Sequence, residues 1–481
     1  MSKSLRHRGP DDSGIETIGP ATLGFRRLSI IDLGGSHQPM SNEDESLWLL
    51  FNGEIYNYRS LREDLISRGH RFKTDGDGEV ILHLYEEEGD DFVHRLNGMF
   101  GIALWDARHR RLVLVRDRLG IKPVYYHVSG KRLAFASETK ALLSVPGLAA
   151  DVDGEAVVGF MNYGSIPGRR TGLESVHRLL PGHLATWDET GFKERCYWDV
   201  SFCEKKRWEF GELVEATGDL LRDAVSLRTV SDVPLGAFLS GGVDSSLVAS
   251  LLGELSSKPV ESFSIGYGNE GAFMDETPFA AAVAERHGMN HHELILDSED
   301  LLRDLDRVAW FLDEPCGDPA AFLTLALSEF TRKHVTVALS GVGADELFCG
   351  YRRYVGLRWQ QRWLRLPSWL RNGVIRRAVE MLPEGRTSRL GDRVRLARKF
   401  VGSVDRDVRT SWALTTSYLP SHPGPLFTGD FAAASRGQYQ AEAFADYWSR
   451  TENCQDAIDR VMYMDLRMYL PDQLLLLQDK M

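Results

Sequence analysis

Cysteine is scarce in this chain of 481 residues. There are five cysteines and no Cys-x-x-Cys pair, so neither a disulfide framework nor a cysteine zinc site is indicated. An excess of positive charge is also lacking, because the formal net charge is −12, which argues against a nucleic-acid-binding protein. No apolar run approaches the roughly 18 residues that span a bilayer, and the start MSKSLRHRGPDDSG has no apolar signal core. We therefore expect a cytoplasmic protein whose partners are neither nucleic acid nor a membrane.

The distribution of apolar residues predicts two domains. Residues 1–195 contain alternating or apolar runs with one helical segment at 58–69, which is typical of an α+β domain. Residues 196–214 form a polar connector. Residues 215–481 begin with alternating helices and strands, which predicts an α/β domain with a parallel sheet between helices. Tight turns in the first domain are predicted at three pairs that contain glycine, Asn52-Gly53, Asp75-Gly76 and Ser129-Gly130.

The stretch PLGAFLSGGVDSSLVASLL, residues 234–252, changes from an apolar strand to a helix at Ser240-Gly241-Gly242. Ligands bind beyond the carboxyl ends of parallel strands, and a glycine loop followed by a helix N-terminus suits an anion. The Ser240 and Ser245 hydroxyls can donate to phosphate oxygens, and Asp244 suits a Mg²⁺ ion bound to those phosphates. The alternative interpretation of this stretch alone is a glycine turn followed by a capped helix.

A second stretch, HVTVALSGVGADELFCGY at residues 334–351, repeats this arrangement. An apolar strand is followed by Ser340-Gly341, and Asp345 then opens a helix. Two such loops can hold one triphosphate and its metal ion from two sides. We therefore predict one nucleotide site in which Asp244 and Asp345 are the metal ligands.

As a set, SGGVDSS, SFSIGY and LSGVGADELFCGY resemble the glutamine-dependent asparagine synthetases of the B type. In the first domain, HRGPDDSG, FRRLSIIDL, HQPM, FNGEIYNY, DGDGEVILHLYEE and RDRLGIKPVYY are similar to the glutaminase half of that family. The resemblance implies an α+β glutaminase domain of the N-terminal-nucleophile type, followed by an adenylating α/β synthetase domain with a pyrophosphatase loop. It implies a ligase that uses ATP and Mg²⁺ to convert aspartate and glutamine, or ammonia, to asparagine, with AMP, pyrophosphate and glutamate as the other products. It also implies a homodimer.

The resemblance implies roles for individual residues. Arg27 pairs with the α-carboxylate of glutamine, Asp77 binds its ammonium group, and Asn52 and Gly53 donate to the oxyanion. For an isolated Asn-Gly pair, a hairpin turn is the better interpretation, but within this series of motifs the oxyanion role is favoured. The implied glutamine-binding residues are Arg27, Leu28, Ser29, Ile30, Ile31, Asn52, Gly53, Glu54 and Asp77. The implied ATP-binding residues are Leu239, Ser240, Gly241, Gly242, Asp244, Ser245, Ile265, Ser340 and Gly341.

Three departures from the family pattern bear on activity. The nucleophile of the family is an N-terminal cysteine, whereas the first cysteine here is Cys196, so we expect no glutamine hydrolysis. Val342 stands where the family has an acid associated with adenylate formation, which puts the specificity for aspartate in question. We also expect the chain to be truncated at both ends, because family members have further segments before HRGPDD and after DKM.

Two alternatives stay open. One is a related amidotransferase, similar to β-lactam synthetase or to the amidotransferases of surface-polysaccharide pathways. The other is a catalytically silent protein that binds glutamine or a nucleotide.

Two further features are interpreted as structural. His287, His291, His292 and Glu293 lie in the run ERHGMNHHE, and their place between a helix and a strand favours solvated or capping roles over a metal site. Residues 352–399 are rich in arginine. They also contain Trp359, Trp363 and Trp369. We expect this segment to form amphipathic helices that pack on the synthetase domain, rather than an RNA-binding site.

Overall fold

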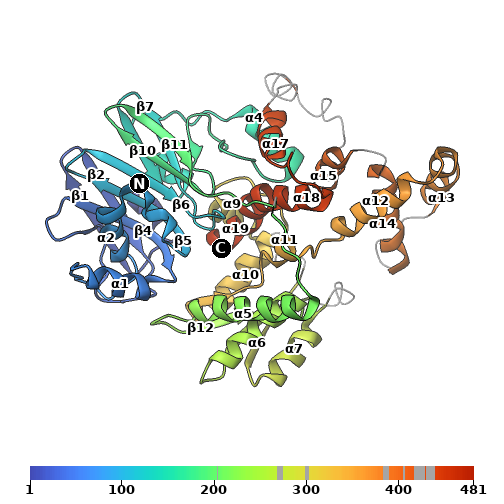
Figure 1. The fold of residues 1–481 in the computed structure, drawn as a ribbon, viewed down its shortest axis with the longest axis horizontal. Helices are drawn as coiled ribbons and strands as arrows, with labels where there is room; N and C mark the ends of the chain where they lie inside the picture. The colour runs from blue at the N-terminus through green and yellow to red at the C-terminus, as the bar shows by residue number, and fades with distance from the viewer. Residues whose placement is uncertain are drawn as a thin grey trace.

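The computed structural model describes residues 1–202, 204–267, 275–297, 303–382, 389–404, 407–416, 428 and 439–481. The two predicted domains lie next to each other, and the C-terminal helix lies between them (Figure 1). Within the described ranges, we find no helix with both the length and the apolar character needed to traverse a bilayer.

The first domain is built mainly from antiparallel strands. Its central six-stranded sheet has the order β11-β10-β6-β5-β4-β3, and two smaller sheets pair β1 with β2 and order β8-β7-β9. The strands are β1 (Asp12–Ile18), β2 (Ala21–Arg27), β3 (Met40–Ser41), β4 (Leu47–Ile55), β5 (Gly98–Asp106), β6 (Arg111–Arg116), β7 (Tyr125–Ser129), β8 (Arg132–Ala136), β9 (His177–Arg178), β10 (His183–Asp188) and β11 (Gly191–Cys196).

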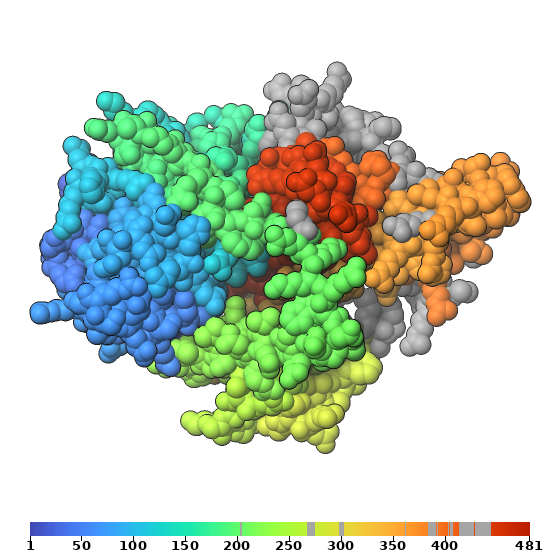
Figure 2. Space-filling view, in the orientation of Figure 1, coloured from blue at the N-terminus to red at the C-terminus, as the bar shows by residue number. Residues whose placement is uncertain are grey.

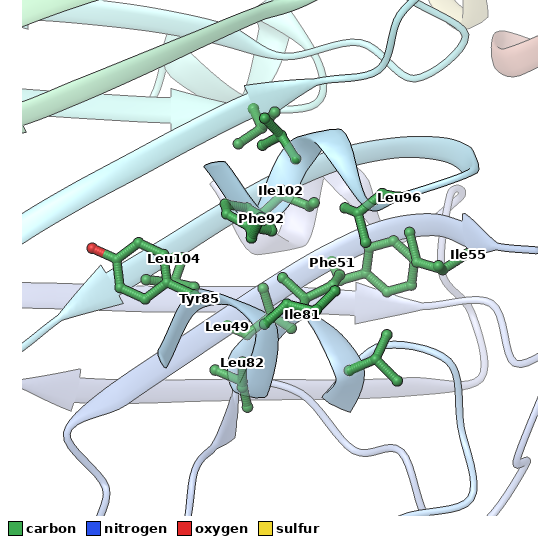
Figure 3. Packing of buried hydrophobic residues seen from close by; sticks show 14 of the residues in the cluster. Leu49, Phe51, Ile55, Ile81, Leu82, Tyr85, Phe92, Leu96, Ile102 and Leu104 are labelled. Carbon is green, nitrogen blue, oxygen red and sulfur yellow. The ribbon is translucent and has the colours of Figure 1, made fainter. Parts of the chain in front are cut away.

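Both faces of the central sheet are buried, because successive residues of a strand point to opposite sides. On one side, Figure 3 shows Ile81 of α2 near Leu49 and Phe51 of β4, in a core cluster that also includes Ile102 of β5. On the other side, Trp105 of β5 belongs to a second cluster with residues of the smaller sheets. The helices of this domain are η1 (Ser2–Leu5), α1 (Tyr58–Ser67), α2 (Glu79–Glu88), η2 (Gly89–His94), α3 (Thr139–Leu142) and α4 (Gly154–Tyr163). The sequence predicted α1 correctly.

One predicted turn is wrong. Asn52 and Gly53 lie inside β4, where they pair with Gly101 and Phe100 of β5. A Cβ atom on Gly53 would lie 1.9 Å from the carbonyl oxygen of Met99, so glycine is required there by close backbone approach rather than by a turn.

The other two predicted turns lie outside the strands and helices, apart from Ser129, which ends β7. Ser129-Gly130 begins the connection between β7 and β8, with Gly130 at φ 57°, as predicted. Asp75-Gly76 lies in the irregular segment before α2.

The second domain contains a parallel sheet, as predicted. Its strand order is β14-β13-β12-β15, and every neighbouring pair is parallel. The chain therefore moves outward from β12 to β14 and then crosses back to β15 on the other side of β12. This reversal between β12 and β15 is the position at which open α/β sheets bind ligands. The strands are β12 (Leu235–Phe238), β13 (Glu261–Tyr267), β14 (Asn290–Leu296) and β15 (Val337–Leu339).

Helices surround this sheet and continue beyond it. The core beside the sheet contains Leu252 of α6 and Ala280 of α7, packed with Leu239 after β12. The helices are α5 (Phe210–Leu227), α6 (Val243–Leu255), α7 (Thr277–Arg286), α9 (Leu305–Leu312), α10 (Ala320–Thr331), α11 (Ala344–Phe348), α12 (Arg352–Leu364), η4 (Trp369–Ile375), α13 (Arg376–Met381), α14 (Arg389–Ser403), α15 (Val408–Thr416), α17 (Tyr439–Ser449), α18 (Ala457–Met464), η6 (Asp465–Leu474) and α19 (Leu475–Lys480).

The arginine-rich helices α12 to α14 project from the side of the molecule (Figure 2). Trp363 is buried against Val401 and Val404. Trp359 and Trp369 are 55% and 68% exposed. The expected packing of helices on the synthetase domain holds for α12, which contacts α15 and α18. The tryptophans do not provide this packing, because two are exposed and Trp363 packs within the helical projection itself.

Buried ion pairs join the two domains. Arg178 of the first domain contacts Glu314 at 2.9 Å and Asp472 at 2.6 Å. Near the C-terminal helix, Lys480 lies 3.5 Å from Glu138. These side chains are almost inaccessible to solvent. Removing one partner would leave a buried charge unpaired, which costs free energy, so the pairs hold the two domains together.

Candidate functional site

A cavity of about 1530 Å³ extends from the first domain into the second. Its wall in the first domain includes the predicted residues Arg27, Leu28, Ile30, Ile31, Asn52, Gly53, Glu54 and Asp77. Its wall in the second domain includes Phe238, Leu339, Ser340, Val342 and Gly343. Residues distant in sequence thus surround one space that begins in the predicted glutamine pocket and reaches the second nucleotide loop.

Asn52 faces this cavity with a free hydrogen-bond donor. Its side-chain amide nitrogen is buried and has no hydrogen-bond partner among the described residues. A buried donor without a partner costs free energy, so a ligand oxygen at this point would be bound favourably. The neighbouring Gly53 also lines this cavity and packs closely against the backbone of Met99 on the adjacent strand. This arrangement fits the predicted oxyanion-binding role.

Glu54 and Asp77 form a buried acidic pair beside Asn52. Each is 8% exposed, and neither forms an ion pair with a described residue. Burial raises the pKa of the Asp77 carboxyl to about 7, and the charge of Glu54 adds to this rise. The Ile55 N–H donates to Asp77 at 2.8 Å and fixes its orientation. Such a pair favours a bound cation, as the α-ammonium group of an amino acid would be.

Arg27 stands at the end of β2 and shapes the loop that follows. Its guanidinium group donates to the carbonyl oxygens of Ile31 and Asp32, both at 2.8 Å. Ser29 lies apart from the rest of the predicted glutamine set. It lines a neighbouring pocket of about 630 Å³, and its N–H donates to Asp11.

The first nucleotide loop forms a compact hydrogen-bonded turn at the carboxyl end of β12. The Ser240 N–H donates to the Ser245 hydroxyl at 3.1 Å, and the two hydroxyls are 2.8 Å apart. Gly241 has φ 82°, and a Cβ atom there would lie 2.8 Å from the carbonyl oxygen of Glu276. The loop therefore needs glycine to fit against the start of α7, and Gly242 then caps α6.

The second loop touches the first. A Cβ atom on Gly341 would lie 2.8 Å from the backbone nitrogen of Ser245, so the loop after β15 lies against the first turn of α6. Asp345 belongs to the short helix α11, as predicted. Burial raises the pKa of the Asp244 carboxyl, and the nearby charge of Asp345 adds to this rise. The two aspartates therefore lie on the same side of the sheet.

These residues fit a divalent cation with phosphates. Both aspartates are half-buried, neither forms an ion pair with a described residue, and their mutual repulsion would be relieved by Mg²⁺. The N–H groups at the start of α6 point toward the same edge and suit phosphate oxygens. Ile265 lies one strand away, near the end of β13. The predicted ATP residues are thus gathered at the position where the strand order reverses.

Two family profiles match the chain. The profile described as "Glutamine amidotransferase domain" matches residues 1–198, and that described as "Asparagine synthase" matches residues 216–481.

The chain belongs to the asparagine synthase family. As in the predicted fold, a glutamine amidotransferase domain precedes a synthetase domain with a parallel sheet. Members of this asparagine synthase family are carbon–nitrogen ligases.

Individual relatives extend over most of the chain. It is 33% identical to asparagine synthetase [glutamine-hydrolyzing] 1 of Bacillus subtilis (strain 168) over 485 residues, covering 100% of this chain and 73% of the relative. It is 36% identical to putative asparagine synthetase [glutamine-hydrolyzing] 2 of Methanocaldococcus jannaschii over 398 residues, covering 77% and 75%.

One solved structure has a slight likeness to this chain. Glutamine phosphoribosylpyrophosphate amidotransferase from B. subtilis, complexed with ADP and GMP, has a TM-score of 0.32 and 16% identity. It covers 61% of this chain and 77% of its own, a likeness too slight to support a conclusion.

The structure also shows cavity residues that the sequence patterns did not indicate. Lys122 and Lys480 line the cavity between the two sites of this asparagine synthase family member, and both pair with acidic residues at the domain boundary. A lysine inside the apolar run GIKPVYY was the one signal available for Lys122. Glu346, next to Asp345, is fully buried and accepts a hydrogen bond from Tyr351 at 2.5 Å.

Cysteines lie away from the glutamine pocket. Cys196, Cys316, Cys349 and Cys454 are free thiols, and none of these four lines the large cavity. Val342, by contrast, is 40% exposed and faces that cavity, at the position where the family resemblance implies an acid.

Proposed function

We propose that this chain is an ATP-dependent ligase that forms asparagine from aspartate and ammonia, with Mg²⁺ at Asp244 and Asp345. The observation that carries the proposal is the contact of the two Ser-Gly loops at the strand-order reversal, where Gly341 lies against the first turn of α6. That contact brings two carboxylates and a helix N-terminus to one edge of the sheet. Aspartate and ATP are the substrates that the family membership supports.

The residues of the two loops would act by binding and charge neutralisation. Mg²⁺ would offset the negative charge of the phosphates during transfer of the adenylyl group to the aspartate β-carboxylate. Ser240 and Ser245 hold the first loop closed through their hydroxyl contact, so its N–H groups are oriented before a nucleotide binds. Preorganised donors of this kind stabilise charge without reorganising during the reaction.

The cavity supports a transfer of ammonia between domains. The lining of this cavity runs from Asn52 and Asp77 to Ser340 and Val342. Ammonia is mostly protonated in neutral water, and an acyl-adenylate is hydrolysed by water. A path between the two sites that keeps bulk water away would therefore protect both reactants.

The glutamine pocket is proposed to bind glutamine without hydrolysing it in this chain. Its binding groups, Asn52, Glu54 and Asp77, are in place, but no cysteine of the four described ones lines it. Purified chain incubated with glutamine should release no glutamate, while added ammonium should support the synthetase reaction. Glutamate release above the no-enzyme control would contradict this prediction.

The deciding experiment is ATP–pyrophosphate exchange. With Mg²⁺ and aspartate, the chain should exchange labelled pyrophosphate into ATP, because adenylyl transfer to a carboxylate is reversible. Exchange that requires another carboxylic acid instead of aspartate would favour a related amidotransferase, a possibility that Val342 raises. Absence of exchange with every acid tested, together with measurable ATP binding, would favour a silent nucleotide binder.

Three further features are part of the proposal. The domain limits 1–195, 196–214 and 215–481 are supported by the end of β11 at Cys196, whereas α5 already begins at Phe210, inside the proposed connector. A cytoplasmic setting is supported by the few, scattered cysteines. A homodimer remains an expectation from the family.

A further inference from the structure

A cluster of metal-ligating side chains lies at the opposite end of the parallel sheet from the nucleotide loops. Glu261 is the first residue of β13, His292 is near the start of β14, and His334 lies shortly before β15. One potential ligand atom from each of the three lies within 4.8 Å of the other two. The three residues come from separate segments, so no single sequence run reveals them.

The register of the sheet explains why Glu261 and His292 meet. Phe263 pairs with His292 across the two strands, and Glu261, two residues before Phe263, projects from the same face. The Glu261 carboxylate lies 2.6 Å from Nε2 of His292. His291, one residue earlier, faces the other side and contacts the Ser262 and Ser264 hydroxyls.

The surroundings of the cluster hold the two imidazoles in position. His292 stacks on Phe263, with ring centroids 5.2 Å apart, and His334 lies 4.2 Å from His292 between the centroids. Phe330 of α10 contacts both histidine rings. The Asn290 side-chain amide donates to the second oxygen of Glu261 at 2.7 Å and orients the carboxylate. Supporting contacts of this kind are typical of metal ligands.

We propose that Glu261, His292 and His334 bind one Zn²⁺ or a similar divalent transition-metal ion. Two imidazoles and a carboxylate are a ligand set that zinc uses, with bonds of about 2.0–2.2 Å and water as a fourth ligand. Ligand atoms in a tetrahedral zinc site are about 3.4 Å apart, so rotations of the half-buried Glu261 and His292 and of the exposed His334 suffice to close the set. The ion replaces the hydrogen bond between Glu261 and His292.

The role of this ion is structural. It ties the amino ends of β13 and β14 to the segment that leads into β15 and the second nucleotide loop. It therefore stabilises the sheet without contacting the nucleotide site. This proposal is independent of the ligase activity, because its readouts are metal binding and thermal stability.

A second histidine-containing group, His70, His83 and Glu86, is also compact. It differs because its histidines already form ion pairs with several carboxylates, including Glu79 and Glu87. Within the described chain, the structure gives the His334 ring no hydrogen bond, so this imidazole is available to a metal ion. We therefore choose the Glu261 group.

The test is a titration of the untagged, metal-free 481-residue chain with ZnCl₂, followed by calorimetry, and with Co²⁺, followed by visible absorption. We expect one tight Zn²⁺ per chain, a Co²⁺ spectrum of the tetrahedral type, and a higher unfolding temperature with Zn²⁺. The single variants Glu261→Gln, His292→Gln and His334→Gln should each weaken Zn²⁺ binding by at least about tenfold. His287→Gln, at the end of α7, is the matched control and should bind as the wild type does.

Two further variants separate this site from others. Asp345→Asn and His70→Gln should retain the tight Zn²⁺ site, because they change the nucleotide loops and the other histidine group. Unchanged Zn²⁺ affinity in all three ligand variants, or no stoichiometric binding by the wild type, would overturn the proposal. If one variant does not fold, the other two and the Co²⁺ spectrum of the wild type still decide the matter.

Discussion

Two pairs of carboxylates, one in each domain, differ in how deeply they are buried. Glu54 and Asp77 lie deep in the first domain, whereas Asp244 and Asp345 are half-buried at the edge of the parallel sheet. Neither pair forms an ion pair with a described side chain. The deep pair suits a small organic cation that loses its hydration shell on binding. The open pair suits a divalent ion that keeps some of its water and is also bound to phosphates. Burial therefore separates two binding functions that use the same chemical group.

The largest expected effect concerns the open pair. Asp345→Asn and Asp244→Asn should each lower ATP–pyrophosphate exchange by at least about 100-fold, because charge stabilisation of phosphoryl groups is lost. Glu254→Gln, at the exposed end of α6, is the control and should leave exchange unchanged. Exchange within about threefold of wild type in both aspartate variants would remove the metal-binding role.

The next effect concerns the contact that brings the open pair together. Gly341→Ala should lower the free energy of unfolding by about 1–3 kcal/mol, because the new methyl group meets the backbone of Ser245. Urea denaturation measures this change. Gly218→Ala, in the middle of α5 where a Cβ meets nothing within 4 Å, should instead stabilise by about 0.5–1 kcal/mol. Equal stability of the two variants would show that the loops are not in contact.

The smallest effect is a pH dependence at the deep pair. In its proposed role, the ionised Asp77 carboxylate would bind the α-ammonium group of glutamine, and the pKa of this carboxyl is raised to about 7. Glutamine affinity should therefore rise as the pH increases through 7 and fall about tenfold for each pH unit below it. Calorimetry from pH 5.5 to 8 measures this slope.

Matched variants isolate the source of that slope. Asp77→Asn should remove it, together with most of the binding. Asp75→Asn, two residues earlier and with a 94% exposed side chain, should keep it. A slope that persists in Asp77→Asn would assign the titration to another group.

Local patterns were sufficient to predict much of the second domain. The helix and strand periods around 235–255 and 337–348 correspond to β12, α6, β15 and α11, and strand order then brings the Ser-Gly loops together. Asn52-Gly53 failed because a turn preference is local, whereas the need for glycine came from Met99 on the neighbouring strand. Local patterns also could not predict the group of Glu261, His292 and His334, because these residues meet only through the pairing of separate strands.

The burial of a side chain could be predicted from the sequence only where the element that covers it could also be identified. Trp359 lies on α12 and Trp369 on η4, and both are exposed on the projecting helices. Periodicity shows which residues share a face but not what covers that face. Similarly, the run GIKPVYY marked Lys122 only as a lysine among apolar residues, and no motif marked Lys480, although both line the cavity.

The ion pairs between the domains limit how such a protein can diversify. Arg178 belongs to the amidotransferase domain, while its carboxylate partners Glu314 and Asp472 belong to the synthetase domain. A hybrid gene that joined this amidotransferase half to a foreign synthetase half would bury an unmatched guanidinium group. A different synthetase half could therefore replace this one without that cost only if it carried carboxylates at the same two positions.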